Sequence, residues 1–517
     1  SGGVYDAAWV YQYRYQALMS ALEAACLYRL EADPRCLRHF ERVIGFYSDH
    51  YAEFDEHGRG PSTSGNGRIM PQALNEAMFL AKTVGGLEML GGKLAPEFVR
   101  SVSEKLLLPG ARFVEAQKKI IHNIPCWINA AVGTVGLFTG TAELTARAFD
   151  EPLGLCDQVR RGITSDHFWY EGSIHYNFFT IESFLMLSAR LYGKALPADV
   201  ERSVYEMVLA PCHYAFSSGA LPNPNDGWPN VNLKTYTYLY EMADRVFDSV
   251  RLRRILSYIY ALPIGRTPLP LSAPVYEGDY SMEWLMFSAG REAPDDSDFR
   301  GSYHFPDSQF AILRGAHVEA FCKYGHRSPS HAHADKMNVE VMAYGRSISR
   351  DLSNCGYAAP LCNGFYRTSV AHNTVLIDGR GHPDTRPGAT EAWDPAGPDL
   401  SVRSEGAYPG VDFHRRLKLG ASAMEDTFVV DGERDHVIDW LFHMEGECAG
   451  CPETEPASLG YAAGEYAYLT DIRRFPPAQT IRLTWSFDGG VTGRQTLETA
   501  GMEVFLCRSS DNPSSKS

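Results

Sequence analysis

Two histidines and an aspartate alternate in the segment SHAHADK, residues 330–336, as His331, His333 and Asp335. On a β-strand, residues two positions apart point to the same face, so a strand here would gather two imidazoles and a carboxylate in one patch. Such a patch can bind a metal ion, or it can transfer protons as a general acid and base. The alternative without a function is a solvated polar strand face.

Two groups further along the chain extend this pattern, Asp351 in SRDLSNCGY and His372 in VAHNTVLIDG. His333, Asp351 and His372 on neighbouring strands would form a nitrogen and oxygen ligand set for zinc, with water or another group completing the tetrahedron. Asp335 is the rival third ligand, because it is in phase with His333. The spacing leaves both ligand sets open, together with a site that binds no metal.

The N-terminal half contributes two further candidate segments. In KKIIHNIPCWINAAVG, His122 and Asn123 come just before an apolar helix, where Asn123 could equally be a helix N-cap. In SDHFWYEGSIHYNFF, the residues Glu171 and Tyr176 lie among aromatic side chains. For this second segment, an aromatic helix face that only packs against the core is the simpler interpretation.

The composition of the chain argues against nucleic acid and a membrane span. The 517 residues carry a formal net charge of −15 and no block rich in Lys or Arg, so nucleic acid is not an expected partner. No run of about 18 apolar residues occurs, and we therefore expect no membrane span. The opening SGGVYDAAWVYQY is not a signal peptide. The compartment stays unknown, with a periplasmic or secreted location slightly favoured.

The eleven cysteines are scattered and mostly sit inside apolar runs, which predicts buried thiols and no disulfide framework. One pair, Cys448 and Cys451 in CAGC, has the spacing of a redox or metal motif. Its surroundings are rich in Gly, Pro and Glu, and they favour a plain surface loop.

The elements that must position these groups change in kind along the chain. Up to about residue 290, long segments with apolar residues at helical spacing follow one another. We expect helices within residues 7–33, 71–90, 96–117, 170–193, 197–216, 233–246 and 250–262. Beyond a polar joint at residues 293–308, short β-branched and aromatic runs predict strands within 309–316, 318–325, 337–345, 372–379, 469–475 and 480–490.

The sequence therefore predicts a multidomain α + β protein. Residues 1–290 would form an N-terminal (α/α) toroid of paired helical hairpins, and residues 291–517 a C-terminal antiparallel β-sheet or sandwich domain. Clefts favour such domain junctions, so the chemistry is expected between the two.

Three motifs in this order, FWYEGSIHYNFF, SHAHADKMNVEV and FYRTSVAHNTVLIDG, resemble the heparinase II/III-like polysaccharide lyases, a group that includes heparin lyases and oligoalginate lyases. The likeness runs from about residue 70 to residue 445. The resemblance implies an (α/α) toroid followed by an antiparallel β-sheet domain, in agreement with the pattern of elements.

The resemblance also implies roles for individual residues. Tyr176 matches the catalytic tyrosine of the family and His331 its catalytic histidine. His122, with Asn123 beside it, matches the group that neutralises the substrate carboxylate. In metal-containing members the residues matching His333, Asp351 and His372 bind Zn²⁺, which is expected to be structural. No organic cofactor is expected.

The implied reaction is β-elimination at a 4-linked uronic acid. A base removes the C5 proton, the C4–O bond breaks, and neutralising the carboxylate stabilises the developing negative charge. Either Tyr176 takes the proton and then protonates O4, or His331 is the base and Tyr176 the acid, depending on the faces of the sugar ring. Residues expected to contact the substrate are Arg314, Trp127, Glu171, Trp228 and Arg367, with Trp169, Arg160 and Arg161 as further candidates.

The expected partner is an anionic polysaccharide or oligosaccharide. A glycosaminoglycan of the heparin or heparan sulfate type is favoured, because HFWYEGSIHY looks closest to the heparinases, and an oligoalginate lyase is the alternative. A glycoside hydrolase on the same helical fold would need two facing carboxylates, for which Glu171 and Asp226 are available. A carbohydrate-binding protein without activity is a third interpretation. The oligomeric state is not predicted.

Overall fold

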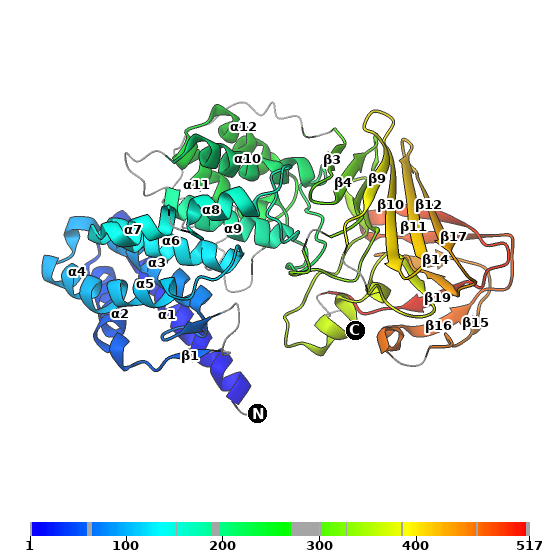
Figure 1. Ribbon diagram of the computed structural model, residues 1–517. Helices are drawn as coiled ribbons and strands as arrows, with labels where there is room; N and C mark the ends of the chain where they lie inside the picture. The colour runs from blue at the N-terminus through cyan, green and yellow to red at the C-terminus, as the bar shows by residue number, and fades with distance from the viewer. Residues whose placement is uncertain are drawn as a thin grey trace.

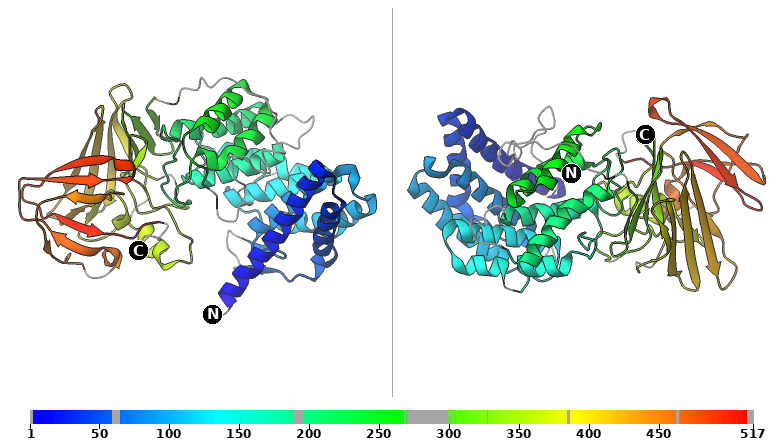
Figure 2. Two further views of the ribbon diagram at one scale, coloured as in Figure 1. Left: turned by 180° about the vertical axis from the view of Figure 1, so that it is seen from behind. Right: turned by 90° about the horizontal axis from the view of Figure 1, so that it is seen from above.

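The chain divides into a helical half and a sheet half in the order that the sequence predicts (Figure 1). The computed structural model describes residues 3–58, 65–150, 152–188, 196–267, 269, 299, 301–326, 328–383, 386–461 and 464–512. The predicted boundary between residues 290 and 291 lies outside the described residues, and so do residues 293–298 and 300 of the predicted joint. Both views in Figure 2 keep the helices and the sheets at opposite ends of the molecule.

Each predicted helical segment contains a helix, and the structure adds helices at residues 34–50, 142–149 and 155–162 that were not predicted. The helices of the first half are α1 (Gly3–Glu31), α2 (Pro34–His50), α3 (Ala73–Leu90), α4 (Pro96–Val102), α5 (Leu108–Glu115), α6 (Asn123–Thr139), α7 (Ala142–Phe149), α8 (Leu155–Gly162), α9 (Ile174–Ser188), α10 (Ala198–Tyr214), α11 (Thr237–Phe247) and α12 (Val250–Ala261). Consecutive helices pack in pairs, such as α1 with α2 and α11 with α12. The predicted helix over residues 96–117 is divided into α4 and α5 by a π-helical turn, Ser103–Leu107.

Helix α6 is the central helix of the helical half. Its residues are buried from Asn123 to Gly136, and it packs against α3, α7 and α9. Two glycines allow this close approach, because a Cβ at Gly133 would lie 2.6 Å from Leu187 on α9, and one at Gly136 would lie 2.7 Å from the Thr145 amide on α7. The N-terminal ends of α6 and α9 carry the candidate residues of this half.

The sheet half is antiparallel throughout its named strands, as predicted. They are β3 (Tyr303–Phe305), β4 (Phe310–Arg314), β5 (Val318–Lys323), β6 (Asn338–Ala343), β7 (Arg346–Ser349), β8 (Val375–Ile377), β9 (Ala389–Asp394), β10 (Asp399–Tyr408), β11 (Val411–Leu419), β12 (Met424–Gly432), β13 (Ile438–Trp440), β14 (Glu447–Gly450), β15 (Glu455–Pro456), β16 (Thr470–Arg474), β17 (Thr480–Ser486), β18 (Thr492–Glu498) and β19 (Phe505–Arg508). The short pair β1 (His57–Gly58) and β2 (Asn66–Gly67) lies in the helical half.

A five-stranded sheet in the order β3-β4-β5-β6-β7 joins the two halves, and both faces of its strand β4 are buried. Phe310, Ile312 and Phe321 point toward the helices and belong to their core. The residues between them, such as Ala311 and Leu313, belong to a second core shared with the four-stranded sheet β12-β11-β10-β9. This double burial explains why β4 is apolar without alternation.

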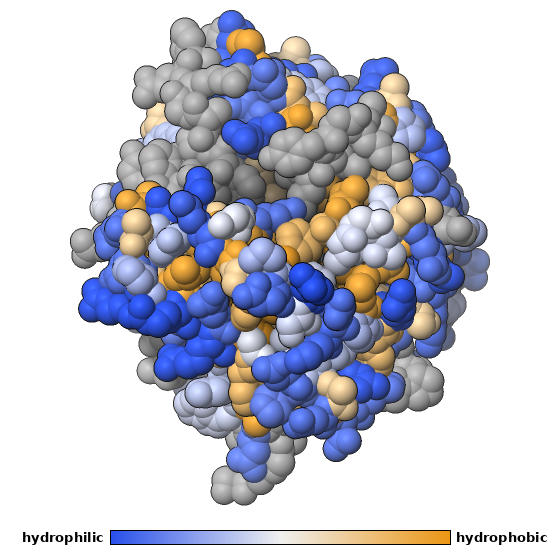
Figure 3. Space-filling view, turned by 90° about the vertical axis from the view of Figure 1, so that its left-hand side faces the viewer, coloured by the Kyte–Doolittle hydropathy of each residue, from blue (hydrophilic) through white to orange (hydrophobic). Residues whose placement is uncertain are grey.

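The remaining strands form smaller units, the pair β13-β8 and the sheets β14-β17-β18 and β15-β16-β19. The cysteines carry free thiols, and those at positions 26, 126, 156, 212, 322 and 362 are buried, as predicted. Cys448 is half-buried and Cys451 exposed. Seen from the helical end, the surface is mostly hydrophilic with small apolar groups (Figure 3). Among the described residues, no helix combines the length and apolar character needed to cross a bilayer.

Candidate active site

The candidate residues meet where the helical half touches the five-stranded sheet. The N-terminal ends of α6 and α9 come from one side, and the loop before β6 comes from the other. That loop is not the predicted strand, because residues 330–337 form turns and His331 has φ of 58°. The alternation of its polar residues therefore does not place them on one strand face.

Tyr176 and His331 lie in direct contact. The ring centroids are 3.6 Å apart and the planes differ by 15°. Tyr176 sits in the first turn of α9, where its amide donates to Ser173 Oγ. The Ser173 hydroxyl in turn donates to the carbonyl of Asp226. The structure thus brings together a phenol from the helical half and an imidazole from the sheet half.

Tyr357 completes this group, although the sequence did not single it out. Its hydroxyl lies 3.0 Å from the Tyr176 hydroxyl, 3.0 Å from His331 Nδ1 and 3.1 Å from Asp226 Oδ2. It follows Asp351 by six residues at the end of SRDLSNCGY. A tyrosine next to a candidate metal ligand was the available signal. Burial is the main cause that raises the pKa of both phenols, to about 12 for Tyr176.

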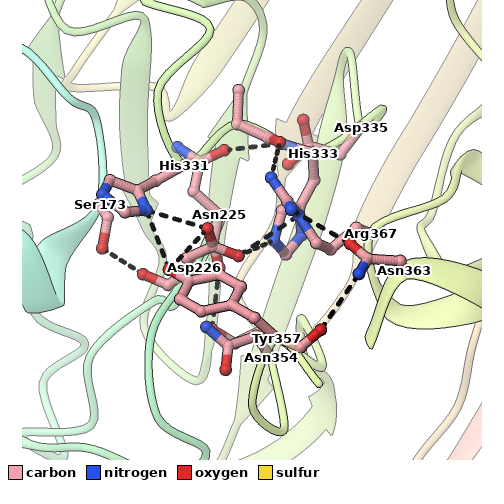
Figure 4. A network of polar contacts seen from close by, with 12 residues as sticks. Ser173, Asn225, Asp226, His331, His333, Asp335, Asn354, Tyr357, Asn363 and Arg367 are labelled. Atoms are coloured by element: carbon pink, nitrogen blue, oxygen red, sulfur yellow. Dashed lines mark hydrogen bonds and ion pairs between the residues drawn. The ribbon is translucent and has the colours of Figure 1, made fainter. Parts of the chain in front are cut away.

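Asp226 holds the sheet side of the site together (Figure 4). Its carboxylate is 1% exposed and accepts hydrogen bonds from His331 Nδ1 at 3.0 Å and His333 Nε2 at 3.1 Å. Arg367 Nε lies 3.4 Å away. Burial alone would raise the pKa of Asp226, but the hydrogen bonds from the two histidines and the nearby positive charge lower it below its usual range.

Glu171 is the buried carboxylate that accepts hydrogen bonds on the helical side of the site. It accepts hydrogen bonds from His122 Nε2, Asn123 Nδ2 and Trp169 Nε1, each at 2.8 Å. The carboxylate is fully buried, and the donors, His122 first, lower its pKa against the effect of burial. The donors expected to neutralise a substrate carboxylate are thus already bonded to a carboxylate of the protein.

The predicted metal ligands His333, Asp351 and His372 converge, with one donor atom of each within 4.8 Å of the others. His372 donates from Nδ1 to the Thr368 carbonyl at 2.7 Å, which leaves the Nε2 lone pair free. His372 Nε2 and His333 Nδ1 are both buried without a hydrogen-bond partner. Two bare imidazole nitrogens beside a carboxylate are the donor set that Zn²⁺ prefers, so these residues fit the metal.

Asp335, the rival ligand, is engaged elsewhere. Its carboxylate oxygens Oδ1 and Oδ2 accept hydrogen bonds from Lys323 Nζ at 2.5 and 2.7 Å, and both groups are buried. The lysine already compensates the charge of this buried aspartate, whereas an Asp351 oxygen lies within 4.8 Å of the donor nitrogens of His333 and His372. This geometry favours Asp351 as the third ligand.

Several residues expected at the substrate lie elsewhere. Trp127 is completely buried and donates from Nε1 to the Phe179 carbonyl, and Trp169 and Glu171 are 1% exposed, so direct sugar contact by these three is wrong. Arg314 is also wrong as a substrate donor, because its buried guanidinium binds the His213 carbonyl at 2.9 Å and Glu319 at 3.3 Å.

Two of the residues expected to contact the substrate are partly exposed near the site. Trp228 is half-buried, and its ring lies 6.2 Å from that of His175, which precedes Tyr176. Arg367, with a side chain 27% exposed, donates to the Ala332 carbonyl at 3.1 Å beside Asp226. Arg160 and Arg161, both on α8, form exposed ion pairs, Arg160 with Asp199 on α10 and Arg161 with Asp157 on α8.

Comparison with known proteins adds four findings. Residues 299–504 match the family described as heparinase II/III-like, C-terminal. An alginate lyase of Stenotrophomonas maltophilia is 25% identical, over 96% of this chain and 72% of its own length. An exo-oligoalginate lyase of Saccharophagus degradans is 22% identical, over 81% of this chain and 60% of its own length. The solved structure of a heparinase III gene product has a TM-score of 0.62 at 14% identity, covering 95% of this chain and 75% of that one.

Proposed function

We propose that this chain is a polysaccharide lyase of the heparinase and alginate lyase type, and that it cleaves the bond to a 4-linked uronic acid by β-elimination. The observation that carries the proposal is the contact between the Tyr176 phenol and the His331 imidazole, with the Tyr357 hydroxyl beside both. These groups can remove the C5 proton and return a proton to O4.

Tyr176 is the proposed acid. With a pKa of about 12, only about one phenol in 10⁵ is ionised at neutral pH, so Tyr176 holds a proton that it can donate to O4 as the C4–O bond breaks. The hydroxyl of Tyr357, 3.0 Å away, can replace that proton.

His331 is the proposed base. Asp226 is ionised and accepts from His331 Nδ1, so the Nε2 lone pair is the one that can take the C5 proton. The ring of His122 lies 6.2 Å from that of His331. A uronate whose carboxylate meets His122 therefore has its neighbouring C5 close to His331.

Neutralisation of the substrate carboxylate is assigned to Arg367 and to His122, whose Nε2–H would exchange its hydrogen bond to Glu171 for one to the substrate carboxylate. The His122 side chain is 14% exposed, whereas Asn123 is 1% exposed and turned toward Glu171. We therefore assign Asn123 to holding Glu171, which in turn orients His122. The guanidinium of Arg367 supplies positive charge beside Asp226 and can meet a carboxylate in a bidentate contact.

Alginate is the substrate that the observations support best. Both curated relatives are alginate or oligoalginate lyases, and their likeness extends over 96% and 81% of this chain. Recognition of a heavily sulfated chain needs several free cationic groups, whereas Arg314 is buried and Arg160 and Arg161 are paired with aspartates. Heparan sulfate, predicted from the motifs, becomes the second candidate.

The hydrolase interpretation loses its chemical basis. A glycoside hydrolase needs a carboxylic acid that is still protonated at working pH. The pKa values of Glu171 and Asp226 are both lowered, and each carboxylate is surrounded by donors that stabilise its ionised form. Neither can serve as that acid.

Zinc is proposed at His333, Asp351 and His372. When bound, a zinc ion supplies positive charge and a cross-link between its ligands. Those ligands come from the loop before β6, the segment after β7 and the segment before β8, so the metal would fix three connections of the sheet half. No step of the elimination is assigned to it.

One assay tests the proposal. The protein is incubated with alginate oligosaccharides, heparan sulfate, hyaluronan and chondroitin sulfate, and the ultraviolet absorbance of the conjugated C4=C5 double bond is followed. We expect that absorbance to rise with alginate oligosaccharides. New reducing ends without it would identify a hydrolase, and binding without either product would identify a protein that has lost catalysis.

A further inference from the structure

One buried carboxylate is shared by the two histidines of the HAH motif. Asp226 Oδ2 lies 3.0 Å from His331 Nδ1, and Asp226 Oδ1 lies 3.1 Å from His333 Nε2. Figure 4 shows the carboxylate between the two rings. One of these rings belongs to the proposed acid and base group, and the other to the proposed metal site.

This sharing decides which nitrogen of each ring is free. An ionised carboxylate only accepts hydrogen bonds, so both facing nitrogens carry protons. The lone pairs then lie on His331 Nε2 and His333 Nδ1. Each of these two atoms is buried and has no hydrogen-bond partner in the described part of the chain. By accepting from both rings, the carboxylate leaves the His331 Nε2 lone pair for proton abstraction and the His333 Nδ1 lone pair for a metal.

We propose that Asp226 is a positioning residue that couples the metal site to the catalytic histidine by fixing the tautomer and orientation of His331 and His333 together. The inference rests on the proposed function for the role of His331. It goes beyond that function because it makes occupancy of the metal site and the competence of His331 depend on one carboxylate.

The backbone around Asp226 is held firmly enough for this task. The Asp226 amide donates to the His331 carbonyl at 3.0 Å, and Ser173 donates to the Asp226 carbonyl. The preceding residue, Asn225, donates to the Gly172 carbonyl at 2.7 Å and accepts from Ser353 Oγ at 2.8 Å. Asp226 is thus tied to the start of α9, to the His331 loop and to the segment that follows Asp351.

The coupling between the metal site and His331 follows from the two hydrogen bonds that the Asp226 carboxylate accepts from His331 and His333. A metal held by His333, Asp351 and His372 would keep the His333 ring oriented with its Nε2–H toward Asp226. Without the metal, the ring can turn or change tautomer, and Asp226 then loses one of its donors. The carboxylate is no longer fixed from that side, and its hold on His331 weakens.

The variant Asp226→Asn tests the inference. An amide keeps the size of the side chain but replaces one acceptor with a donor, so it cannot accept from both histidines. We expect kcat to fall about 10²-fold or more with KM changed less than about 3-fold, as for a lost tautomer in other histidine sites. Zinc affinity, measured by competition with a chromogenic chelator, should weaken about 10- to 100-fold.

The matched control is Asp166→Asn. Asp166 also accepts several hydrogen bonds across the two halves, from the Asp307 and Ser308 amides at 2.8 and 3.0 Å, but it contacts neither histidine. This variant should lower thermal stability while leaving kcat and zinc affinity near those of the wild type. A purely structural Asp226 would give the same result as this control, and that result would overturn the proposal.

A measurement of the imidazole tautomers in the wild-type protein does not depend on turnover. Two-dimensional ¹H–¹⁵N spectra report the tautomer of each imidazole, with the His331 signals assigned from their loss in His331→Gln. We expect His331 to carry its proton on Nδ1 in the zinc-loaded protein and to lose that single tautomer when zinc is chelated. An unchanged spectrum on chelation, or a wild-type protein that binds no zinc, would refute the coupling even if lyase activity is found.

Discussion

The ring of Tyr176 lies against the ring of His331 with centroids 3.6 Å apart, although 155 positions separate the two residues in the sequence. One ring stands on the first turn of α9 and the other on the loop before β6. The proposed site exists only where the two halves meet. Each prediction below follows from a contact at that junction.

Removing the phenol oxygen of Tyr176 should stop the reaction without affecting the fold. In Tyr176→Phe the ring can still stack on His331, and among the described residues the lost hydroxyl bonds only the Tyr357 hydroxyl, at 3.0 Å. We expect kcat to fall at least about 10²-fold with little change in melting temperature. The control Tyr205→Phe removes a hydroxyl that bonds Ser249 on the outer helices and should keep full activity. Substantial turnover by Tyr176→Phe would remove Tyr176 from its role as acid.

Tyr357→Phe should weaken catalysis less than Tyr176→Phe. Tyr357 donates to Asp226 and lies 3.0 Å from Tyr176, so its loss interrupts resupply of the proton but leaves the donor phenol in place. We expect a decrease in kcat of about 10- to 10²-fold. Steady-state rates from double-bond absorbance decide the order of the two variants, and equal or larger damage from Tyr357→Phe would identify Tyr357 as the acid.

His372→Ala should remove zinc and stability together. The substitution deletes a bare, buried nitrogen 3.3 Å from Asp351 and leaves two of three proposed ligands. Zinc content by elemental analysis and the thermal midpoint should both fall. His414→Ala, which changes a half-buried histidine beside Glu391, should alter neither. A wild-type protein that holds no zinc after exposure to the metal would contradict the assignment.

Acid should destabilise the protein before its carboxylates titrate. Burial lowers the pKa of four histidines to about 4, namely His175, His213, His382 and His443. Their folded pKa values lie below the ordinary value of 6.5, so the unfolded chain binds more protons between about pH 6.5 and pH 4. The free energy of unfolding should therefore fall as the pH falls through this window.

Urea unfolding at about pH 7 and about pH 5 measures this effect. In His382 both nitrogens are used, because Nε2 donates to the Val375 carbonyl and Nδ1 accepts from the Lys336 amide. His382→Gln removes one proton-binding group, so the difference in stability between the two pH values should become smaller. An unchanged difference would show that His382 does not contribute.

Glu171→Gln should affect catalysis through His122. The amide can accept from Trp169 and Asn123, but it no longer offers an ionised oxygen to His122 Nε2, now 2.8 Å away. We expect a loss of about 1–3 kcal/mol in stability and a decrease in kcat of about tenfold or more. If Glu171→Gln raised the rate instead, Glu171 would be a competitor for His122 and not its support.

The order of helices and strands could be predicted because local patterns determine it. Apolar residues at helical spacing identified α1, α3 and α9, and the β-branched runs identified β4 to β6. The motif residues Tyr176 and His331 were found by resemblance. The turn at residues 330–337 was not predicted, because a left-handed φ at His331 is set by contacts with Asp226 and the loop around it.

The role of Asp226 could not be predicted from its own surroundings. It lies in NPNDGWPN, which reads as a loop, and its partners lie 105 and 107 positions further along the chain. Likewise nothing near Trp127 or Arg314 in the sequence indicates that other segments bury them. Partners far apart in the chain are decided by tertiary packing, which single-sequence patterns do not encode.

The five-stranded sheet with two apolar faces has a consequence for how the chain is made. The helices leave the ribosome before β3 to β6 are translated, so the helical surface that Phe310, Ile312 and Phe321 later cover is exposed to solvent at that stage. Chaperones must protect a nascent chain in this state from aggregation. A protein truncated after the helices would aggregate. Catalytic competence is therefore acquired last in biogenesis, when the sheet closes over that surface and brings its histidine to the waiting tyrosine.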